Sequence, residues 1–299
     1  MNYAIAIDIG GSNTRVALVS ENYEIIKREQ FKTDINSPEK TIQEIKRIIE
    51  NFNTKAQGIG LSCPGPLDLL NGAILVTTNL NEPWYNYPIS KALKEATGLE
   101  VYLENDANLA TLAESVIGQG KDYRYVQFLT VSTGLGSGLV IDKKIYIGAH
   151  GFAHEIAHLP VWRNGPSHGM IKPGGIEAIS SGTAIEERAR KAGLDVKHAG
   201  EVNDLALKGN AIAMEIMEDA KEYLANTIAI IYSFIDPEIV ILGGSVALKI
   251  EGFVEDVERR VKTKVFDPLI PYVKVVKTDL NEDSGLLGGA CLVFFKESK

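Results

Sequence analysis

The stretch Glu104-Asn105-Asp106 places two carboxylates and a carboxamide where a strand is expected to turn into a helix. Residues 101–103 are mostly apolar, and the apolar residues between 109 and 116 recur with the spacing of one helix face. Side chains at such a junction project from the edge of a sheet rather than into the core. Asp106 could therefore take the proton from an attacking hydroxyl group, while Asn105 holds that hydroxyl in place. The alternative is that either residue only caps the helix, because Asn and Asp are preferred caps.

A polar turn that contains glycine follows the first expected strand, residues 3–8. Glycine lets backbone N–H groups approach an anion because no Cβ stands in the way. Asp8, at the end of that strand, could hold magnesium directly or through water, since this ion gives up its waters reluctantly. The candidate nucleotide-binding residues of this turn are Asp8, Gly10, Gly11, Ser12, Asn13 and Thr14. The alternative is an ordinary polar β-hairpin turn, and the Walker A pattern G-x-x-x-x-G-K-[ST] is absent from the sequence.

The opening pattern of strand, small-residue turn and strand recurs in the second half of the chain. Residues 125–131 and 139–142 are expected strands, with the glycine-rich turn STGLGSG (132–138) between them. This duplication predicts two related lobes, and their turns could bind a polyphosphate from both sides. A third candidate phosphate or adenine contact follows the buried strand 239–242 and precedes a helix. The candidate nucleotide contacts in this half are Thr133, Gly134, Gly136, Gly243, Gly244 and Ser245.

Length, charge and cysteine content narrow the class of protein. A chain of 299 residues is long for one core and suits two lobes. Its net charge of −8 argues against a nucleic-acid-binding surface, which would need a basic stripe. The sequence has neither the basic and apolar segments of a signal peptide nor an apolar stretch long enough to cross a bilayer. The two cysteines, Cys63 and Cys291, are far apart and predict a reducing, cytoplasmic environment without disulfides.

Seven motifs occur in the order found in one family of sugar kinases. They are DIGGSNTR, GLSCPGPLD, END, TVSTGLGSGLV, EIAH, GGIEAISSG and DPEIVILGGSV. Through them, nearly the whole chain resembles the ROK family, which has the actin-like ATPase fold. The resemblance implies ATP- and magnesium-dependent phosphorylation of a hexose, with Asp106 as the base on the sugar 6-hydroxyl and Asn105 on the neighbouring hydroxyls. The further sugar contacts that the resemblance implies are Gly65, Thr78, Glu155, His158 and Glu177.

The expected fold is an α/β, two-lobed, ribonuclease-H-like duplicated fold with a cleft between the lobes. Residues 1–107 should form a small N-terminal lobe with helix 285–299 packed on it, and residues 108–284 should form a larger lobe. The resemblance also implies a homodimer. Glucose is the first choice of sugar. Mannose, glucosamine, N-acetylglucosamine and N-acetylmannosamine stay open, because the motifs do not report the space around the 2-substituent.

One segment departs from the family pattern. The family carries Glu-x-Gly-His and then a zinc-binding loop with the pattern C-x-C-G-x-x-G-C-x-E. Here Ala157 replaces the glycine, and the loop WRNGPSHGMIKPGGIE contains no cysteine. No structural zinc is therefore expected, and another kind of packing must hold the segment that carries Glu177.

Two other functions fit parts of the sequence. Residues 154–158 match H-E-x-x-H, the zinc-protease motif, which needs both histidines on one face of a sustained helix. Glycine and proline flank this motif too closely for such a helix. A non-catalytic sugar sensor of the same fold is the closer alternative, although the intact Asn105-Asp106 pair favours an enzyme. The repressors of the family carry an N-terminal helix-turn-helix, for which the turn beginning at Asp8 leaves no room.

Overall fold

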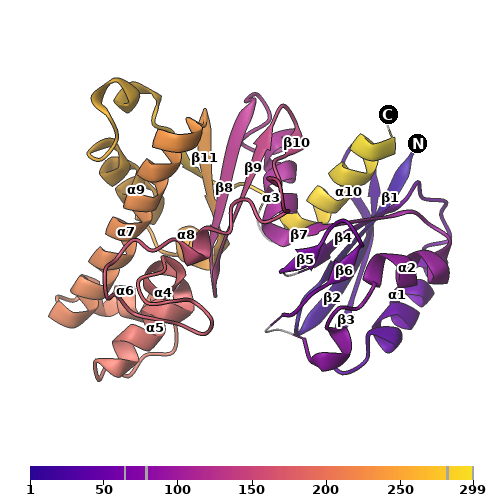
Figure 1. Ribbon diagram of the computed structural model, residues 1–299, viewed down its shortest axis with the longest axis horizontal. Helices are drawn as coiled ribbons and strands as arrows, with labels where there is room; N and C mark the ends of the chain where they lie inside the picture. Colours follow the sequence, from indigo (N-terminus) through magenta and orange to yellow (C-terminus); the bar gives the residue numbers. More distant parts are fainter. Residues whose placement is uncertain (64, 78–79, 281–282, 298–299) are drawn as a thin grey trace. The chain divides into compact units, whose positions relative to one another are not determined.

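The computed structural model describes residues 1–63, 65–77, 80–280 and 283–297. The chain forms two compact units, and each contains a five-stranded sheet (Figure 1). The first unit comprises Met1–Ile117, Ile145–Ala153 and Glu282–Lys299, and the second comprises Gly118–Lys144 and His154–Asn281. In the described part of the chain, no helix is both long and apolar enough to span a membrane.

The sheet of the first unit has the strand order β3-β2-β1-β4-β7. Its first three strands form an antiparallel meander, whereas β4 and β7 run parallel to β1. The strands are β1 (Tyr3–Ile9), β2 (Asn13–Ser20), β3 (Ile25–Lys32), β4 (Ile59–Cys63) and β7 (Val101–Asn105). The other elements of this unit are α1 (Pro38–Phe52), β5 (Leu67–Asp68), β6 (Ala73–Ile74), η1 (Glu82–Trp84), α2 (Ile89–Thr97), α3 (Asp106–Val116) and α10 (Ser284–Glu297).

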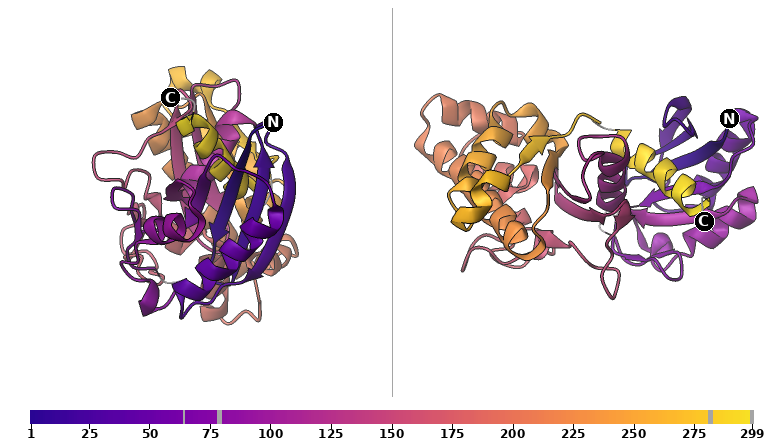
Figure 2. Two further views of the ribbon diagram at one scale, coloured as in Figure 1. Left: turned by 90° about the vertical axis from the view of Figure 1, so that its right-hand side faces the viewer. Right: turned by 90° about the horizontal axis from the view of Figure 1, so that it is seen from above.

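The residues of β1 alternate between two helical layers. Ile5 and Ile7 are fully buried in a cluster that includes Ile45 of α1. Ala6 points the other way, because a Cβ built on Gly289 of α10 would lie only 3.6 Å from the Cβ of Ala6. This alternation follows from the two-residue period of a strand. The left view of Figure 2 accordingly shows α1 and α10 on opposite faces of the sheet.

Glycines let α10 approach its neighbours closely. A Cβ on Gly60 of β4 would lie 2.0 Å from the carbonyl oxygen of Gly289, and one on Gly288 would lie 2.0 Å from that of Leu109 in α3. Only glycine fits at such contacts between backbones. Because α3 is packed against α10 in this way, it stays with the first unit, which extends to Ile117 rather than ending at the expected residue 107.

The sheet of the second unit repeats the arrangement of the first, with the order β10-β9-β8-β11-β12. β8 and β9 are antiparallel, and β11 is parallel to both β8 and β12. The strands are β8 (Tyr125–Val131), β9 (Leu135–Ile141), β10 (Lys144–Ile145), β11 (Ile239–Gly243) and β12 (Val275–Lys277). The helices are η2 (Ile156–His158), α4 (Glu177–Ser180), α5 (Gly182–Lys191), α6 (Ala199–Leu207), α7 (Ala211–Ile235), α8 (Gly244–Lys249), α9 (Phe253–Lys262) and η3 (Asp267–Tyr272).

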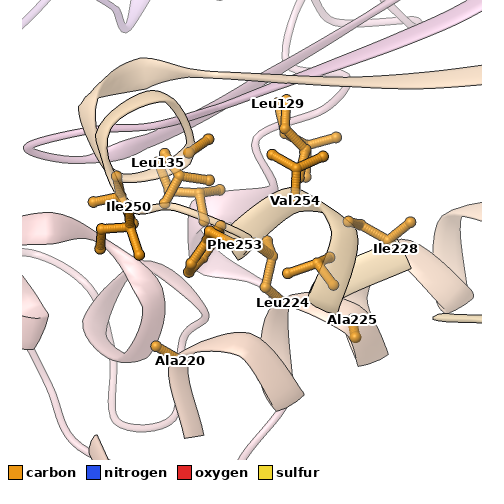
Figure 3. Close-up of a cluster of buried hydrophobic side chains, with 14 of the residues drawn as sticks. Leu129, Leu135, Ala220, Leu224, Ala225, Ile228, Ile250, Phe253 and Val254 are labelled. Carbon is orange, nitrogen blue, oxygen red and sulfur yellow. The ribbon is translucent and has the colours of Figure 1, made fainter. Parts of the chain in front are cut away.

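Helices α7 and α9 supply much of the core of the second unit. Figure 3 shows Leu224 and Ile228 of α7 beside Phe253 and Val254 of α9, with Leu129 of β8 above them. All five side chains are buried. Leu224 and Ile228 are four residues apart and share one face of α7, and Val254 and Val257, three residues apart, share one face of α9.

Two sequence-based predictions for the second unit were wrong. The expected turn 132–138 is shorter, because β9 already begins at Leu135 and Gly136 pairs with Thr130 inside the sheet. Glycine has no side chain to pack against neighbouring strands, so the many glycines in this segment favoured the prediction of a turn. In the structure, pairing with β8 nevertheless makes residues from Leu135 onward a strand. Helix α6 was also missed, since Gly200 weakens its sequence signal.

Candidate functional site

The turn between β1 and β2 carries an acidic group whose orientation is fixed. Arg15 donates to Oδ2 of Asp8 from Nη2 at 2.7 Å and from Nε at 3.1 Å. The two residues face each other in the hairpin register, one on each strand. The N–H of Gly10 donates to the carbonyl of Asn13 at 2.9 Å and closes the turn. The predicted hairpin geometry is thus present, with Asp8 one residue before the end of β1.

Thr14 differs from the other polar residues of this turn. Its side chain is fully buried, whereas Ser12 and Asn13 are exposed. Thr33 donates its hydroxyl hydrogen to the carbonyl of Gly10 at 2.7 Å, so Thr14 is the donor in the 2.9 Å bond between the two threonine hydroxyls. The Thr14 hydroxyl therefore stabilises the turn from inside, and Ser12 and Asn13 are the side chains that can meet a ligand.

The junction between β7 and α3 has the form that the sequence predicts. Oδ1 of Asn105 accepts from the N–H groups of Ala107 at 2.9 Å and Asn108 at 3.4 Å, so Asn105 caps the helix. Its amide nitrogen is the end that can donate to a ligand hydroxyl. Oδ1 of Asp106 also accepts from the N–H of Ala107, at 2.8 Å. Both side chains are thereby held at the start of α3.

Glu104, which sequence reasoning did not assign to the site, supports this junction. Its carboxylate is buried, and Oε1 accepts from the N–H of Asn105 at 2.9 Å and from Nδ2 of Asn108 at 3.0 Å. A buried carboxylate that accepts two hydrogen bonds fixes the groups that donate to it. Glu104 therefore orients the backbone from which Asn105 and Asp106 project.

Parallel pairing brings the β1–β2 turn and the β7–α3 junction to one edge of the sheet. The register aligns Asp8 with Ser62 of β4, and the next residue, Cys63, with Asn105 of β7. Burial raises the pKa of the Cys63 thiol well above its usual value, and the negative charges of Asp8 and Asp106 raise it further. Both carboxylates thus act on the same buried thiol, so the candidate base and the candidate metal-binding group lie at the same sheet edge.

In the second unit, two turns and a helix start come together. Oγ of Ser132 lies 3.2 Å from Oγ of Ser245, which links the β8–β9 turn to the start of α8. The N–H of Gly182, at the start of α5, donates to the carbonyl of Ser132 at 2.7 Å. Gly244 has φ +86° between β11 and α8, and a Cβ there would lie 2.5 Å from the carbonyl oxygen of Val131. The motifs around Thr133 and Gly243 are therefore neighbours, as the sequence analysis required.

A cavity of about 570 Å³ adjoins these turns within the second unit. Thr133 and Ser245, both predicted nucleotide contacts, belong to its lining. Its other lining residues come from α5, α6, α8 and their flanks: Gly182, Thr183, Glu186, His198, Ala199, Gly200, Asn203, Asp204, Val246, Lys249 and Ile250. Sequence reasoning missed the contribution of α6, although Val202, Leu205 and Ala206 have helical spacing.

Glu155, His158 and Glu177 form a second group of predicted site residues in this unit. Oε2 of Glu177 accepts from the N–H of Leu135 at 2.8 Å, and a Cβ on Gly134 would lie 2.8 Å from the same oxygen. Partial burial raises the pKa of Glu155, the neighbouring His158 lowers it, and the charge of Glu177 raises it. The three side chains therefore lie close enough to influence one another electrostatically.

The H-E-x-x-H segment lacks the geometry of a zinc protease. His154 has φ +67°, and only Ile156–His158 form a single 3-10 turn. The two histidines therefore do not share one face of an α-helix, which that motif requires. Of the remaining predicted sugar contacts, Gly65 lies in the loop between β4 and β5, and Thr78 lies outside the described residues.

The residues of the first unit fit a magnesium ion whose ligands come mainly from the phosphates of a bound substrate and from water. Among the described residues, no three His, Cys, Asp or Glu side chains gather as possible ligands of one metal ion. Magnesium is commonly bound through one or two carboxylates together with substrate phosphates and water. Asp8 is such a carboxylate, and its Oδ2 accepts a hydrogen bond from Arg15. The donor set thus fits a hydrated magnesium ion.

Comparison with known proteins assigns the chain to a family. Residues 4–295 match the ROK family. The chain belongs to the ROK family. It is 30% identical to a glucokinase of Thermotoga maritima, with 97% of this chain and 96% of the relative covered. It is also 30% identical to an N-acetylmannosamine kinase of Salmonella heidelberg, over 96% of this chain and 97% of the relative.

A solved structure of a ROK hexokinase confirms the predicted fold class. The ROK hexokinase from Thermus thermophilus is 28% identical, with a TM-score of 0.90 over 99% of both chains. The present chain is therefore an α/β protein with the two-lobed actin-like ATPase fold, and the ROK family resemblance inferred from its motifs is confirmed.

Proposed function

We propose that this ROK protein transfers the γ-phosphoryl group of ATP to the 6-hydroxyl of a hexose, with Asp106 as the general base. The observation that carries the proposal is the position of Asp106. Its carboxylate lies at the start of α3, directly after β7, at the sheet edge that also bears Asp8. A base must reach the attacking hydroxyl, and a metal-binding carboxylate must reach the phosphates, so both groups are needed in one region.

Each residue has a distinct task in this reaction. Asp106 accepts the proton of the sugar hydroxyl while the oxygen forms a bond to the γ-phosphorus and the bond to the β-phosphate oxygen breaks, releasing ADP. The amide nitrogen of Asn105 donates to the neighbouring sugar hydroxyl and holds the acceptor in line. Magnesium, when bound, neutralises charge on the phosphates. Asp8, which Arg15 orients, would hold that ion directly or through water.

Glucose is the proposed substrate, and other hexoses and amino-hexoses with a free 6-hydroxyl are the alternative substrates. Relatives at equal identity are named glucokinase and N-acetylmannosamine kinase, which supports a hexose but not one particular hexose. In this account Glu155 and Glu177 accept hydrogen bonds from sugar hydroxyls, and His158 contributes a further polar contact. Two carboxylates near one imidazole suit a neutral ligand rich in hydroxyl donors.

The cavity beside Thr133 and Ser245 is the proposed site of the adenosine part of ATP. Its volume of about 570 Å³ is within the range typical of small-molecule sites. Glu186 and Asp204 place two carboxylates in its lining against one lysine, Lys249. Carboxylates repel a polyanionic chain but accept hydrogen bonds from ribose hydroxyls. The lining therefore favours a nucleoside triphosphate over inorganic polyphosphate as phosphoryl donor.

A panel of sugars and donors tests this function. Glucose, mannose, glucosamine, N-acetylglucosamine and N-acetylmannosamine are incubated with ATP and Mg²⁺, and both ADP and the sugar phosphate are quantified. The position of the phosphate is read by NMR. We expect sugar-dependent ADP formation with phosphate on oxygen 6, and no transfer from polyphosphate. Sugar binding without turnover on any member of the panel would refute the kinase and leave the sensor function.

A further inference from the structure

Trp162 lies between η2 and α4 and rests on α5 and α7. Its ring stacks on that of Tyr223 in α7, with centroids 4.8 Å apart and planes 10° from parallel. The guanidinium carbon of Arg188 in α5 lies 5.6 Å from the centroid of the Trp162 ring. Arg188 also forms an ion pair with Asp219 of α7. Aromatic stacking and a cation near the tryptophan ring both stabilise this position.

The backbone around Trp162 joins the two arms of the segment that runs from residue 159 to residue 176. The N–H groups of Val161 and Trp162 donate to the carbonyl of Gly174 at 3.0 and 3.3 Å. The N–H of Ile176 donates to the carbonyl of Leu159 at 3.1 Å. The first arm begins directly after His158, and the second ends directly before Glu177. A displacement of Trp162 would therefore move both of these side chains.

The fit of the arms leaves little freedom around Trp162. Gly174 has φ +82°, and a Cβ on it would lie 1.9 Å from the carbonyl oxygen of Trp162. At the tip of the segment, Nδ1 of His168 lies 3.2 Å from Oε2 of Glu187 in α5. Ile171 is buried against Ala157 and the start of α4. These are secondary contacts, whereas Trp162 is the only Phe, Trp or Tyr between residues 153 and 222.

We propose that Trp162 is a positioning residue for sugar binding: it anchors the arms that carry Glu155, His158 and Glu177 to α5 and α7. This inference rests on the proposed function, because it assumes that those three side chains meet the sugar. Both cysteines of the chain, Cys63 and Cys291, lie in the first unit. The anchor of this segment is therefore an aromatic and guanidinium stack rather than a thiolate-bound metal.

Kinetics of three variants test the positioning role. For Trp162→Ala we expect the KM for the sugar to rise about tenfold or more while kcat changes less than about threefold, because ground-state binding is lost and the base is untouched. Trp162→Phe retains stacking and should restore the KM to within about threefold of the wild type. Tyr223→Leu removes the partner ring without altering the segment and should raise the KM in the same direction. The matched control is Phe234→Ala, an exposed aromatic residue of the same helix α7.

Limited proteolysis tests the anchor independently of activity. Arg163 is exposed and follows Trp162 directly, so trypsin cleavage after it reports how firmly the segment is held. We expect faster cleavage in Trp162→Ala and Tyr223→Leu, and the wild-type rate in Phe234→Ala. Unchanged cleavage together with an unchanged sugar KM would overturn the proposal. Faster cleavage of Trp162→Ala and Tyr223→Leu, in a protein whose wild type turns over no sugar, would support the anchoring role of Trp162 but refute the proposed function. The proposal would also be overturned if the purified protein held a zinc ion whose removal weakens sugar binding, while Trp162→Ala leaves sugar binding unchanged.

Discussion

Arg15 and Asp8 face each other across the β1–β2 hairpin, with 2.7 Å between Nη2 and Oδ2. The carboxylate is thereby fixed before any ligand binds, and preorganised charges need no rearrangement during the reaction. For Asp8→Asn we expect kcat to fall by about 100-fold, because the metal-bound phosphates lose a charged partner. The dissociation constant of the sugar, measured by calorimetry without nucleotide, should not change. An equal loss of sugar affinity would show that Asp8 acts on the fold rather than on phosphoryl transfer.

The contact of Gly288 with the backbone of Leu109 predicts a large loss of stability on a minimal substitution. Gly288→Ala would place a methyl group 2.0 Å from a carbonyl oxygen, so α10 must shift from α3. We expect the free energy of unfolding to fall by about 2 kcal/mol. Gly285→Ala, in the same helix, is the control: its Cβ would meet only Oγ of Ser62 at 3.8 Å. That variant should be as stable as the wild type or slightly more stable, and equal thermal shifts in both variants would contradict the packing described here.

Glu155 predicts how sugar binding depends on pH. Its raised pKa means that protonation begins at a higher pH than for an ordinary glutamate, and a protonated carboxyl is a poorer acceptor for sugar hydroxyls. The KM for the sugar should therefore rise on the acid side of neutrality, and Glu155→Gln should remove this dependence. A wild-type KM that stays constant from pH 8 down to about pH 4.5, the usual value for a glutamate pKa, would exclude the role given to Glu155.

The same shift has a consequence for stability. The raised pKa means that the folded chain binds the Glu155 proton more tightly than the unfolded chain does. The free energy of unfolding therefore falls as the pH rises from the usual glutamate pKa through the raised pKa of the folded state. At neutral pH, Glu155→Gln should thus unfold at a slightly higher temperature than the wild type, and this gain should vanish below the usual range. Glu251→Gln, on an exposed turn, serves as the control and should show neither effect.

A substitution in the cavity of the second unit should change the KM for ATP without changing the KM for the sugar. Asn203 of α6 lines it, so Asn203→Trp should fill part of the space and raise the KM for ATP by about tenfold or more. The KM for the sugar should stay within about twofold of its wild-type value. Leu207→Trp places the same side chain on the same helix at a position that is 80% exposed and outside the cavity lining. A normal KM for ATP in Asn203→Trp would place the nucleoside elsewhere.

Residue patterns predicted the parts of this protein that depend on local chemistry. The end of β1 at Ile9, next to Asp8, and the start of α3 at Asp106 follow from strand runs that stop at polar and glycine residues. The burial of β1 and the repeated strand order follow from the same apolar pattern. These features are set by residues close in sequence, and a single chain carries enough information for them.

Contacts between distant residues were beyond the reach of sequence patterns. Nothing near Trp162 indicates that Tyr223, far along the chain, lies under its ring. The pairing of Gly136 inside β9 depends on its neighbour β8 and overrides the flexibility of glycine. Burial of the Thr14 side chain likewise depends on Thr33, the residue directly after β3. Such contacts arise only when the folded backbone brings the partners together.

The most direct test of the account replaces Asp106 by asparagine. Asp106→Asn keeps the shape of the side chain and an oxygen that can accept from the N–H of Ala107, but it removes the ability to accept the proton of the sugar hydroxyl. ADP and sugar phosphate formation are measured at saturating sugar and MgATP, and sugar affinity is measured by calorimetry. We expect kcat to fall by about 100-fold to 10,000-fold with sugar affinity nearly unchanged. A variant that turns over at the wild-type rate would show that Asp106 is a helix-start residue and not the base.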